Sequence, residues 1–170
     1  MMQQEESFEI VAPNGKIVGI ARRSELHRNP SLVHRVVHVL VFNLQGLLLL
    51  QKRSRNKDTA PGKWDTSVGG HVNIGEDIRS AALRELREEL GIEGCTLLFL
   101  YDYLFSNQQE TELVSTFSCV HSGPFLFSRE EIDDVRFWRI EDIGVQLDND
   151  KFSDQFREEF TRYRKFCGGR

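Results

Sequence analysis

The sequence predicts an α/β fold of the α+β kind, with a central mixed β-sheet packed between helices. Apolar runs of strand length alternate along the chain with two amphipathic stretches of helix length, which is typical of such a fold. The chain contains no internal repeat and no low-complexity tract. With 170 residues it can bury about 70% of the surface that its unfolded form exposes. We therefore expect one domain spanning residues 1–170.

The first elements form a predicted β-hairpin. Phe8–Val11 and Ile17–Ala21 flank the turn-forming sequence Pro13-Asn14-Gly15, a pattern typical of two paired strands. We expect an extra N-terminal hairpin extension over residues 1–30. An exposed ribbon of this kind could exchange or pair across a homodimer.

The centre of the sheet is predicted from two apolar runs. Val36–Asn43 and Leu47–Arg53 are joined around Gly46, and both have the length and composition of strands. Further along the chain, apolar patterns predict three more strands and a closing amphipathic helix. These are Thr96–Phe105, Leu113–Val120, Val135–Arg139 and the helix Ser153–Phe166.

A helix is predicted between the central strands and the later ones. It should span Ile78–Leu90, because Asp77 is a good N-cap and Gly91 suits the left-handed residue that ends a helix. Three leucines recur on one side of this helix and would pack on the sheet. They are Leu83, Leu86 and Leu90.

The same helix carries an acidic cluster. At about 100° per residue, Glu85, Glu88 and Glu89 fall within an arc of roughly 100° on one side. Like charges at these spacings destabilise a helix by roughly 0.2 to 0.5 kcal/mol per pair, and bound divalent cations would reverse that effect. Without the wider pattern, the spacing is more typical of a solvated face on which Arg84 pairs with Glu88.

The wider pattern extends from Gly70 to Ile92. The chain reads glycine, five residues, Glu76, seven residues, Arg84-Glu85-Leu86, one residue, Glu88-Glu89, one residue and Gly91-Ile92. These residues match every fixed position of the signature of the Nudix hydrolases, so residues 70–92 resemble a Nudix box. The resemblance implies a Nudix-type α/β/α sandwich. It also implies hydrolysis of a diphosphate that is linked to another group.

The resemblance implies a role for each matching residue. A Mg²⁺ or Mn²⁺ site would be formed by the carboxylates of Glu85, Glu88 and Glu89, with Glu85 and Glu89 as direct ligands. The backbone carbonyl of Gly69 would join them, and Glu76 would pair with Arg84 to brace the loop against the helix. Mg²⁺ suits such a site because it prefers hard oxygen ligands together with substrate phosphates. The general base is left open among Glu88, Glu110 and Glu112.

Basic residues gather just before the box, beside the expected diphosphate site. Five of them lie within twelve residues, namely Lys52, Arg53, Arg55, Lys57 and Lys63. Exposed lysines rarely need a function, so a solvated loop is one interpretation. The other is that Arg53, and also Lys63, bind a phosphate of the substrate, since the planar fork of arginine can hold two oxygens.

Histidines suggest a second metal site. His27, His34 and His71, together with Glu110 and Glu112, resemble the metal-binding set of the Nudix-fold isopentenyl-diphosphate isomerases. Those enzymes use a cysteine in a Cys-Gly-His sequence, where this chain has Gly69-Gly70-His71. The chain therefore resembles the isopentenyl-diphosphate-isomerase-like branch of the Nudix hydrolases. For a single histidine, packing within a strand remains the alternative.

Three functional classes follow from these patterns. The first is a Mg²⁺-dependent hydrolase that cleaves a diphosphate linkage in a nucleoside diphosphate derivative or a related small molecule. The second is an isopentenyl-diphosphate isomerase, which is disfavoured because Gly69 replaces the catalytic cysteine. The third is a module that binds such a compound without cleaving it, which the intact box makes least favoured.

Composition excludes other classes of protein. The net charge of −4 provides no basic surface for stable nucleic-acid binding, and no stretch of 18 apolar residues predicts a membrane span. The N-terminal residues lack the pattern of a signal peptide. The three cysteines, Cys95, Cys119 and Cys167, form no CxxC pair. We expect a cytoplasmic protein.

Overall fold

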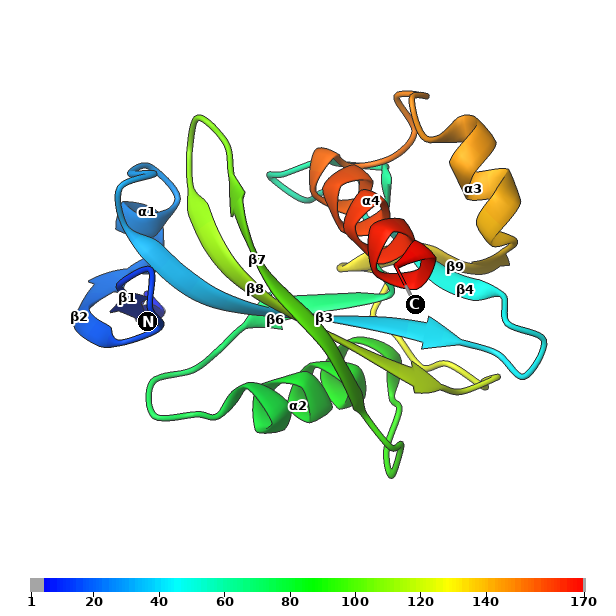
Figure 1. The fold of residues 1–170 in the computed structure, drawn as a ribbon, viewed down its shortest axis with the longest axis horizontal. Coiled ribbons are helices and arrows are strands. Elements are labelled where there is room, and N and C mark those ends of the chain that lie inside the picture. Colours follow the sequence, from blue (N-terminus) through cyan, green and yellow to red (C-terminus); the bar gives the residue numbers. More distant parts are fainter. Residues whose placement is uncertain (1–4, 170) are drawn as a thin grey trace.

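A computed structural model describes residues 5–169, and in this part of the chain nine strands form one mixed sheet (Figure 1). The central strand β3 (Val33–Phe42) pairs in parallel with β8 (Thr111–Val120) and antiparallel with β6 (Val68–His71). The other strands pair antiparallel. They are β1 (Ser7–Val11), β2 (Ile17–Arg22), β4 (Leu48–Arg53), β5 (Trp64–Asp65), β7 (Leu98–Ser106) and β9 (Ile132–Trp138).

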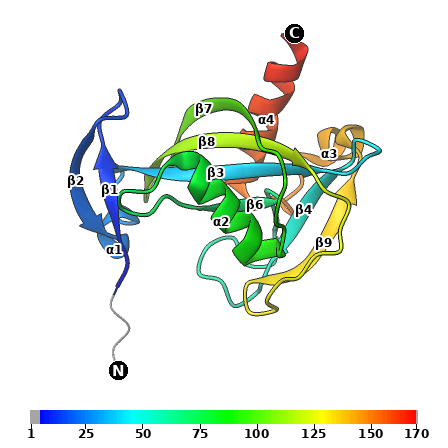
Figure 2. The same ribbon diagram turned by 90° about the horizontal axis from the view of Figure 1, so that it is seen from below.

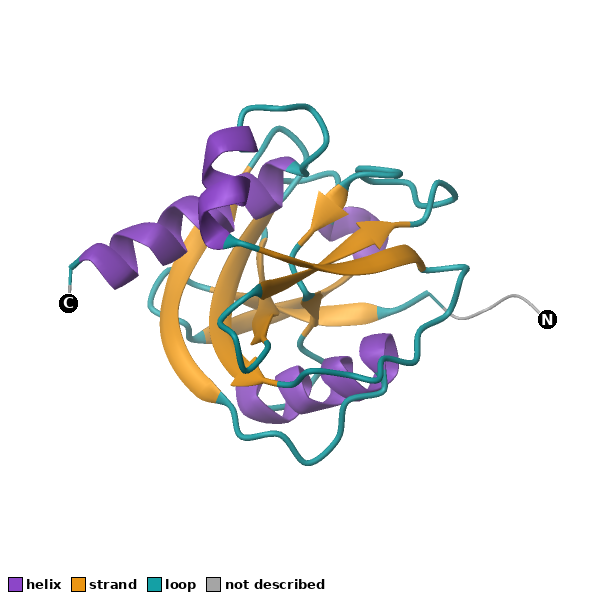
Figure 3. Cartoon of the chain, turned by 90° about the vertical axis from the view of Figure 1, so that its right-hand side faces the viewer, coloured by secondary structure: helices purple, strands orange, loops and turns teal. Residues whose placement is uncertain are grey.

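Helices cover both faces of this sheet (Figures 1 and 3). Helix α2 (Ile78–Leu90) packs on one face, where Val37 and Val39 of β3 join its core cluster. Helices α3 (Ile140–Gln146) and α4 (Asp154–Gly168) pack on the other face, with Leu40. Alternate residues of β3 thus enter different cores, as the twofold repeat of a strand requires. The predicted α/β/α sandwich with a mixed sheet is confirmed, and no helix within residues 5–169 is long and apolar enough to cross a membrane.

Helix α2 begins and ends as its sequence predicts. The side chain of Asp77 accepts hydrogen bonds from the backbone N–H groups of the first turn, and Gly91 adopts φ 67° at the C-terminus. The prediction of a buried leucine stripe is wrong for Leu83, which is 39% exposed. Ala81 and Ala82 are buried instead, because their small side chains let the helix lie close to the strands.

Four short elements were not predicted. Helices α1 (Arg23–Leu26) and α3 have four and seven residues, and strands β5 and β6 have two and four. Strand β6 contains Gly69-Gly70, which has low intrinsic strand preference and is held by its pairing with β3. Such elements depend on neighbours that are distant in sequence, so local patterns do not predict them.

The predicted hairpin lies at one end of the sheet (Figure 2). Strand β1 pairs with β2 and also meets β3, where Ile10 lies opposite His34. Residues 1–4 of the predicted extension lie outside the described residues. The hairpin is therefore continuous with the central sheet, and it contacts the segment that carries His34.

A buried polar network lies between α4 and the sheet. Glu159 of α4 is fully buried and accepts hydrogen bonds from the side chains of His38 (2.7 Å), Tyr101 (2.7 Å), Tyr103 (2.9 Å) and Thr116 (3.0 Å). Burial disfavours both charges of the His38–Glu159 pair, but their mutual hydrogen bond and attraction outweigh it. As a result the pKa of His38 is raised and the pKa of Glu159 is lowered.

Candidate metal and diphosphate site

Strand β6 and helix α2 bring the backbone of residues 69–71 against a carboxylate of the helix. The register of β6 places Gly69 opposite His38, and Gly70 opposite Val37, on β3. A Cβ atom at Gly70 would lie only 2.0 Å from Cδ of Glu85, so any side chain there would displace that carboxylate. Glycine at position 70 therefore allows Glu85 to lie directly on the strand.

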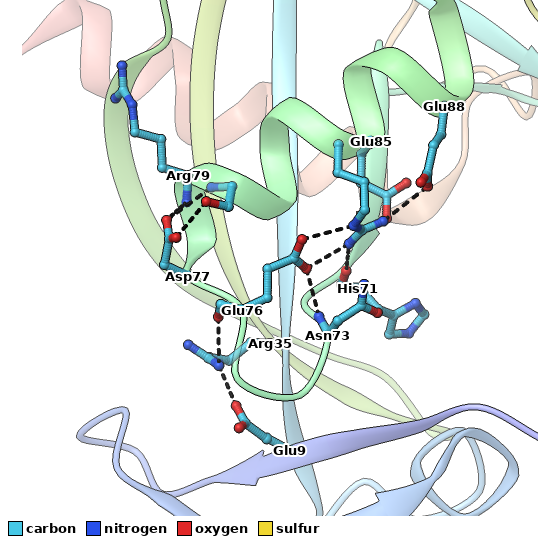
Figure 4. Close-up of polar contacts among 11 residues, drawn as sticks. Glu9, Arg35, His71, Asn73, Glu76, Asp77, Arg79, Glu85 and Glu88 are labelled. Atoms are coloured by element: carbon cyan, nitrogen blue, oxygen red, sulfur yellow. Dashed lines mark hydrogen bonds and ion pairs between the residues drawn. The ribbon is translucent and has the colours of Figure 1, made fainter.

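The guanidinium of Arg84 links three acidic residues of the box. These are Glu76, Glu85 and Glu88, whose side chains are labelled in Figure 4. The Nε and Nη2 atoms of Arg84 donate to the two oxygens of Glu76, each over 2.9 Å. Its Nη1 donates to Glu85 at 2.6 Å and to Glu88 at 3.1 Å, and Nη2 also donates to the carbonyl of His71 at 2.9 Å. Hydrogen bonding between the partners raises the pKa of Arg84 and lowers the pKa of Glu76. The loop before α2 is thereby tied to the helix by a charged, two-point contact.

Glu85 and Glu89 are the box carboxylates whose hydrogen bonds do not offset the cost of burying a negative charge. Burial raises the pKa of Glu85 despite the hydrogen bond from Arg84. Burial, followed by the charge of Glu85, raises the pKa of Glu89 to about 8, although Gln51 donates to Glu89 at 3.0 Å. Negative charge that burial disfavours in this way is stabilised by a bound cation, so these two carboxylates fit a divalent metal.

The three box glutamates do not converge into one compact group. The side chain of Glu88 is 51% exposed and pairs with Arg84, whereas Glu89 contacts Gln51. Within residues 5–169, these glutamates form no group of three ligand atoms that all lie within 4.8 Å of one another. Arg84 donates to both Glu85 and Glu88 in this arrangement, and the metal-ligand roles of the three glutamates stay a prediction.

The residues of the predicted second site come together from four segments. His27 follows α1, His34 lies on β3, His71 ends β6, and Glu110 and Glu112 lie at the start of β8. The Nε2 atoms of His27 and His71 are 3.3 Å apart. Nε2 of His27 lies 3.4 Å from Oε2 of Glu110, and Nε2 of His34 lies 3.7 Å from Oε1 of Glu112. The five side chains form two groups that share His34, each with its ligand atoms within 4.8 Å.

The chemistry of this histidine cluster suits a cation. Both ring nitrogens of His34 and Oε2 of Glu110 are buried without a hydrogen-bond partner. Burial lowers the pKa of His27 and lowers that of His71 well below its ordinary value of 6.5, which favours the neutral form of the ring that binds metals. Burial, then the charge of Glu112, raises the pKa of Glu110 to about 7. Unsatisfied buried imidazole and carboxylate atoms are the ligands that Zn²⁺ or Mn²⁺ binds.

Two glutamines at these sites were not predicted. Gln51 of β4 donates to Glu89, and Gln155 of α4 donates to Glu112. The one sequence signal for Gln51 was a polar residue directly after the apolar run Leu47–Leu50. Gln155 had no such signal, because its contact depends on how α4 docks on the sheet.

The two predicted phosphate-binding residues have different surroundings. Arg53 donates to the backbone carbonyl and hydroxyl of Thr59 and forms an ion pair with Asp65 at 3.5 Å. Its charge partly offsets the burial that raises the pKa of Glu89. Lys63 forms an ion pair with Asp150 at 2.8 Å. The structure therefore associates Arg53, more than Lys63, with the end of α2.

Comparison with known proteins extends these observations. Residues 32–160 match the NUDIX domain family. An uncharacterized Nudix hydrolase from Yersinia pestis is 34% identical over 143 residues, which cover 84% of this chain and 78% of that protein. The crystal structure of DR0079 from Deinococcus radiodurans has a TM-score of 0.80 at 24% identity, covering 92% of this chain and 98% of that one. The NUDIX domain of NrtR from Shewanella oneidensis, crystallised with ADP ribose, has a TM-score of 0.62 at 15% identity, covering 79% and 88%.

Proposed function

Because this chain belongs to the Nudix family and is a hydrolase that acts on diphosphate bonds, we propose that it is a Mg²⁺-dependent Nudix hydrolase. The proposed substrate is a nucleoside diphosphate derivative or a related small molecule with a diphosphate linkage. One observation carries the proposal. Arg84 and Glu76 brace the loop against α2. Two carboxylates of that helix, Glu85 and Glu89, have raised pKa values.

Three groups would hold the cation. These are the carboxylates of Glu85 and Glu89 and the backbone carbonyl of Gly69. The backbone N–H of Gly69 donates a hydrogen bond to Glu89. All are hard oxygen ligands of the kind that Mg²⁺ and Mn²⁺ prefer. When bound, Mg²⁺ would supply neutralisation of phosphate charge and activation of a water molecule. Arg84 would keep Glu85 in place through its 2.6 Å hydrogen bond.

Glu88 is the carboxylate that we assign as the proton acceptor. Its side chain is half exposed and reaches Arg84, so water can approach its free oxygen. Glu110 and Glu112 are the alternatives, but both belong to the histidine cluster and lie next to its imidazoles. We further propose that Arg53 binds a substrate phosphate in place of its present partners Thr59 and Asp65, because its charge acts on Glu89 and its fork can hold two oxygens.

The function is tested by release of phosphate or mononucleotide from a panel of diphosphate compounds. The panel should include nucleoside diphosphate derivatives, nucleotide sugars, dinucleotides and prenyl diphosphates. We expect turnover with Mg²⁺ or Mn²⁺ and none after chelation with EDTA. Turnover that persists without a divalent cation would contradict the proposed metal dependence.

The histidine cluster supports placing the chain in the isopentenyl-diphosphate-isomerase-like branch of the family. All five of its residues lie together in the structure. Isomerase activity itself is the second candidate, but Gly69 has no thiol, and a Cβ atom there would lie 3.1 Å from the ring of His38. Cys95 and Cys119 lie in the core beneath α2. Proton exchange into isopentenyl diphosphate in heavy water would reveal this activity.

The second metal site is tested by metal analysis of variants. Replacing His34 by Ala should remove about one bound Zn²⁺ or Mn²⁺ per chain, because His34 contributes to both ligand groups. His27→Ala should weaken binding in the same direction. The matched control is His121→Ala, whose ring packs on Phe125 outside the cluster. Equal metal content in His34→Ala and the parent protein would rule out this site.

A further inference from the structure

One buried carboxylate of the N-terminal hairpin reaches the loop that precedes α2. Glu9, on β1, is only 6% exposed. Its Oε1 accepts a hydrogen bond from the backbone N–H of Gly75 at 3.0 Å, and its Oε2 forms an ion pair with Nη2 of Arg35. Charged side chains are rarely buried unless they are paired. Because both carboxylate oxygens of Glu9 have a partner, this position suits a charged carboxylate.

Arg35 extends this contact toward the box (Figure 4). The Nη2 atom that pairs with Glu9 also donates to the backbone carbonyl of Glu76 at 3.4 Å. The side chain of Glu76 is in turn bound at two points by Arg84, which donates to Glu85. Glu9 thus stands at the start of a continuous series of polar contacts that ends at a proposed metal ligand.

The loop has other contacts, because Arg84 binds Glu76 and the Asn73 N–H also donates to Glu76. Among the described residues, however, Glu9 accepts the hydrogen bond from the Gly75 N–H. Gly75 adopts φ 74° and lacks a side chain, so nothing but its backbone can anchor it. Phe8, which precedes Glu9 on β1, stacks on His71 with the ring centroids 4.4 Å apart. Because successive side chains of a strand point to opposite faces, β1 contacts the segment 71–76 with both of its faces.

We infer that Glu9 is a positioning residue for the hydrolytic site. It holds the loop Asn73–Glu76 so that Glu76 orients Arg84, and Arg84 orients Glu85. Glu9 itself contacts none of the box carboxylates, so its effect passes through the loop. The catalytic part of this inference rests on the proposed function, whereas the structural part can be measured without any substrate.

The test uses Glu9→Gln in the full chain. Glutamine keeps the size of the side chain, but its amide group has one acceptor and one donor. It can therefore satisfy either Gly75 or Arg35, but not both. The charged Arg35 is the stronger donor, so it should take the carbonyl oxygen and leave the Gly75 N–H without an acceptor. The matched control is Glu6→Gln in the same extension, because the side chain of Glu6 is 65% exposed and its ion pair with Arg23 is at the surface.

Two measurements decide the inference. Amide hydrogen exchange by NMR should show the Gly75 N–H exchanging about 10-fold faster in Glu9→Gln, with the amides of α2 unchanged. At saturating Mg²⁺, kcat should fall by about 10- to 100-fold while KM and the thermal midpoint change little. Glu6→Gln should match the parent in both measurements.

Three outcomes are distinguishable. Unchanged exchange at Gly75 would overturn the inference. Faster exchange with unchanged kcat would also overturn it, since the loop would then have no influence on turnover. If the parent hydrolyses nothing, the proposed function fails and the catalytic role of Glu9 fails with it, while the exchange data still show whether Glu9 holds the loop.

Discussion

Replacing Glu89 by Gln is expected to lower kcat/KM for diphosphate hydrolysis by about 10³-fold. Glutamine preserves the shape and the contact with Gln51, but it removes the negative charge that would bind the cation. Burial raises the pKa of Glu89 to about 8, so the charged form of this side chain is not what stabilises the fold. The thermal midpoint without added metal should therefore be equal to that of the parent or higher.

The control for this prediction is Glu93→Gln. Glu93 is exposed and lies just beyond the C-terminus of α2, so the same chemical change should leave activity within about twofold of the parent. Adding Mg²⁺ should raise the thermal midpoint of the parent more than that of Glu89→Gln, because a ligand stabilises only the state that binds it. If Glu89→Gln kept more than about a tenth of parental activity, Glu89 would not be a metal ligand.

Replacing Glu159 by Ala is expected to lower the free energy of unfolding by about 3 to 5 kcal/mol. The variant would leave buried His38 without its charged partner, and the hydroxyls of Tyr101 and Tyr103 without an acceptor. Chemical denaturation at several pH values measures the effect. The adjacent variant Glu158→Ala loses only a surface ion pair with Arg162 and should stay within about 0.5 kcal/mol of the parent.

The loss of unfolding free energy in Glu159→Ala should depend on pH in a defined direction. Because the pKa of Glu159 is lowered in the folded state, this carboxylate stabilises the fold at pH values above its ordinary pKa of 4.5. That stabilisation is lost as the pH falls through the folded-state pKa. Because the pKa of His38 is raised in the folded state, this ring stabilises the fold at pH values below its ordinary pKa of 6.5. That stabilisation is lost as the pH rises through the folded-state pKa. The difference between parent and Glu159→Ala should thus be largest between pH 4.5 and 6.5. A difference that is constant from pH 3 to pH 9 would show that packing alone accounts for it.

The predictions that the structure confirms depended on local patterns. Asp77 and Gly91 bound α2 as expected, because capping and left-handed glycine are decided by a few neighbouring residues. The hairpin around Gly15 and the apolar central strands were likewise found close to their predicted positions. Leu83 differed because the side of a helix that is buried depends on what packs against it.

The candidate site divides in the same way. The spacing of Gly70, Glu76, Arg84 and Glu85 could be recognised in the sequence, since these residues follow one another along strand β6, the loop after it and helix α2. The residues that form hydrogen bonds with this site from other elements could not be predicted from the sequence. Gln51, Gln155 and Glu9 come from other elements, and their polar groups reach the site only through the pairing of strands and the docking of α4.

The sequence by itself determined the family pattern, the fold class and the residues with ligand chemistry, because each depends on residue type and short-range spacing. Only the tertiary structure decided that His27, His34 and His71 face one another, and that both ring nitrogens of His34 are buried without a hydrogen-bond partner. It also decided that Glu88 stays exposed while Glu89 is partly buried. Burial and the approach of charges from distant segments set these properties, and neither is encoded in the local order of residues.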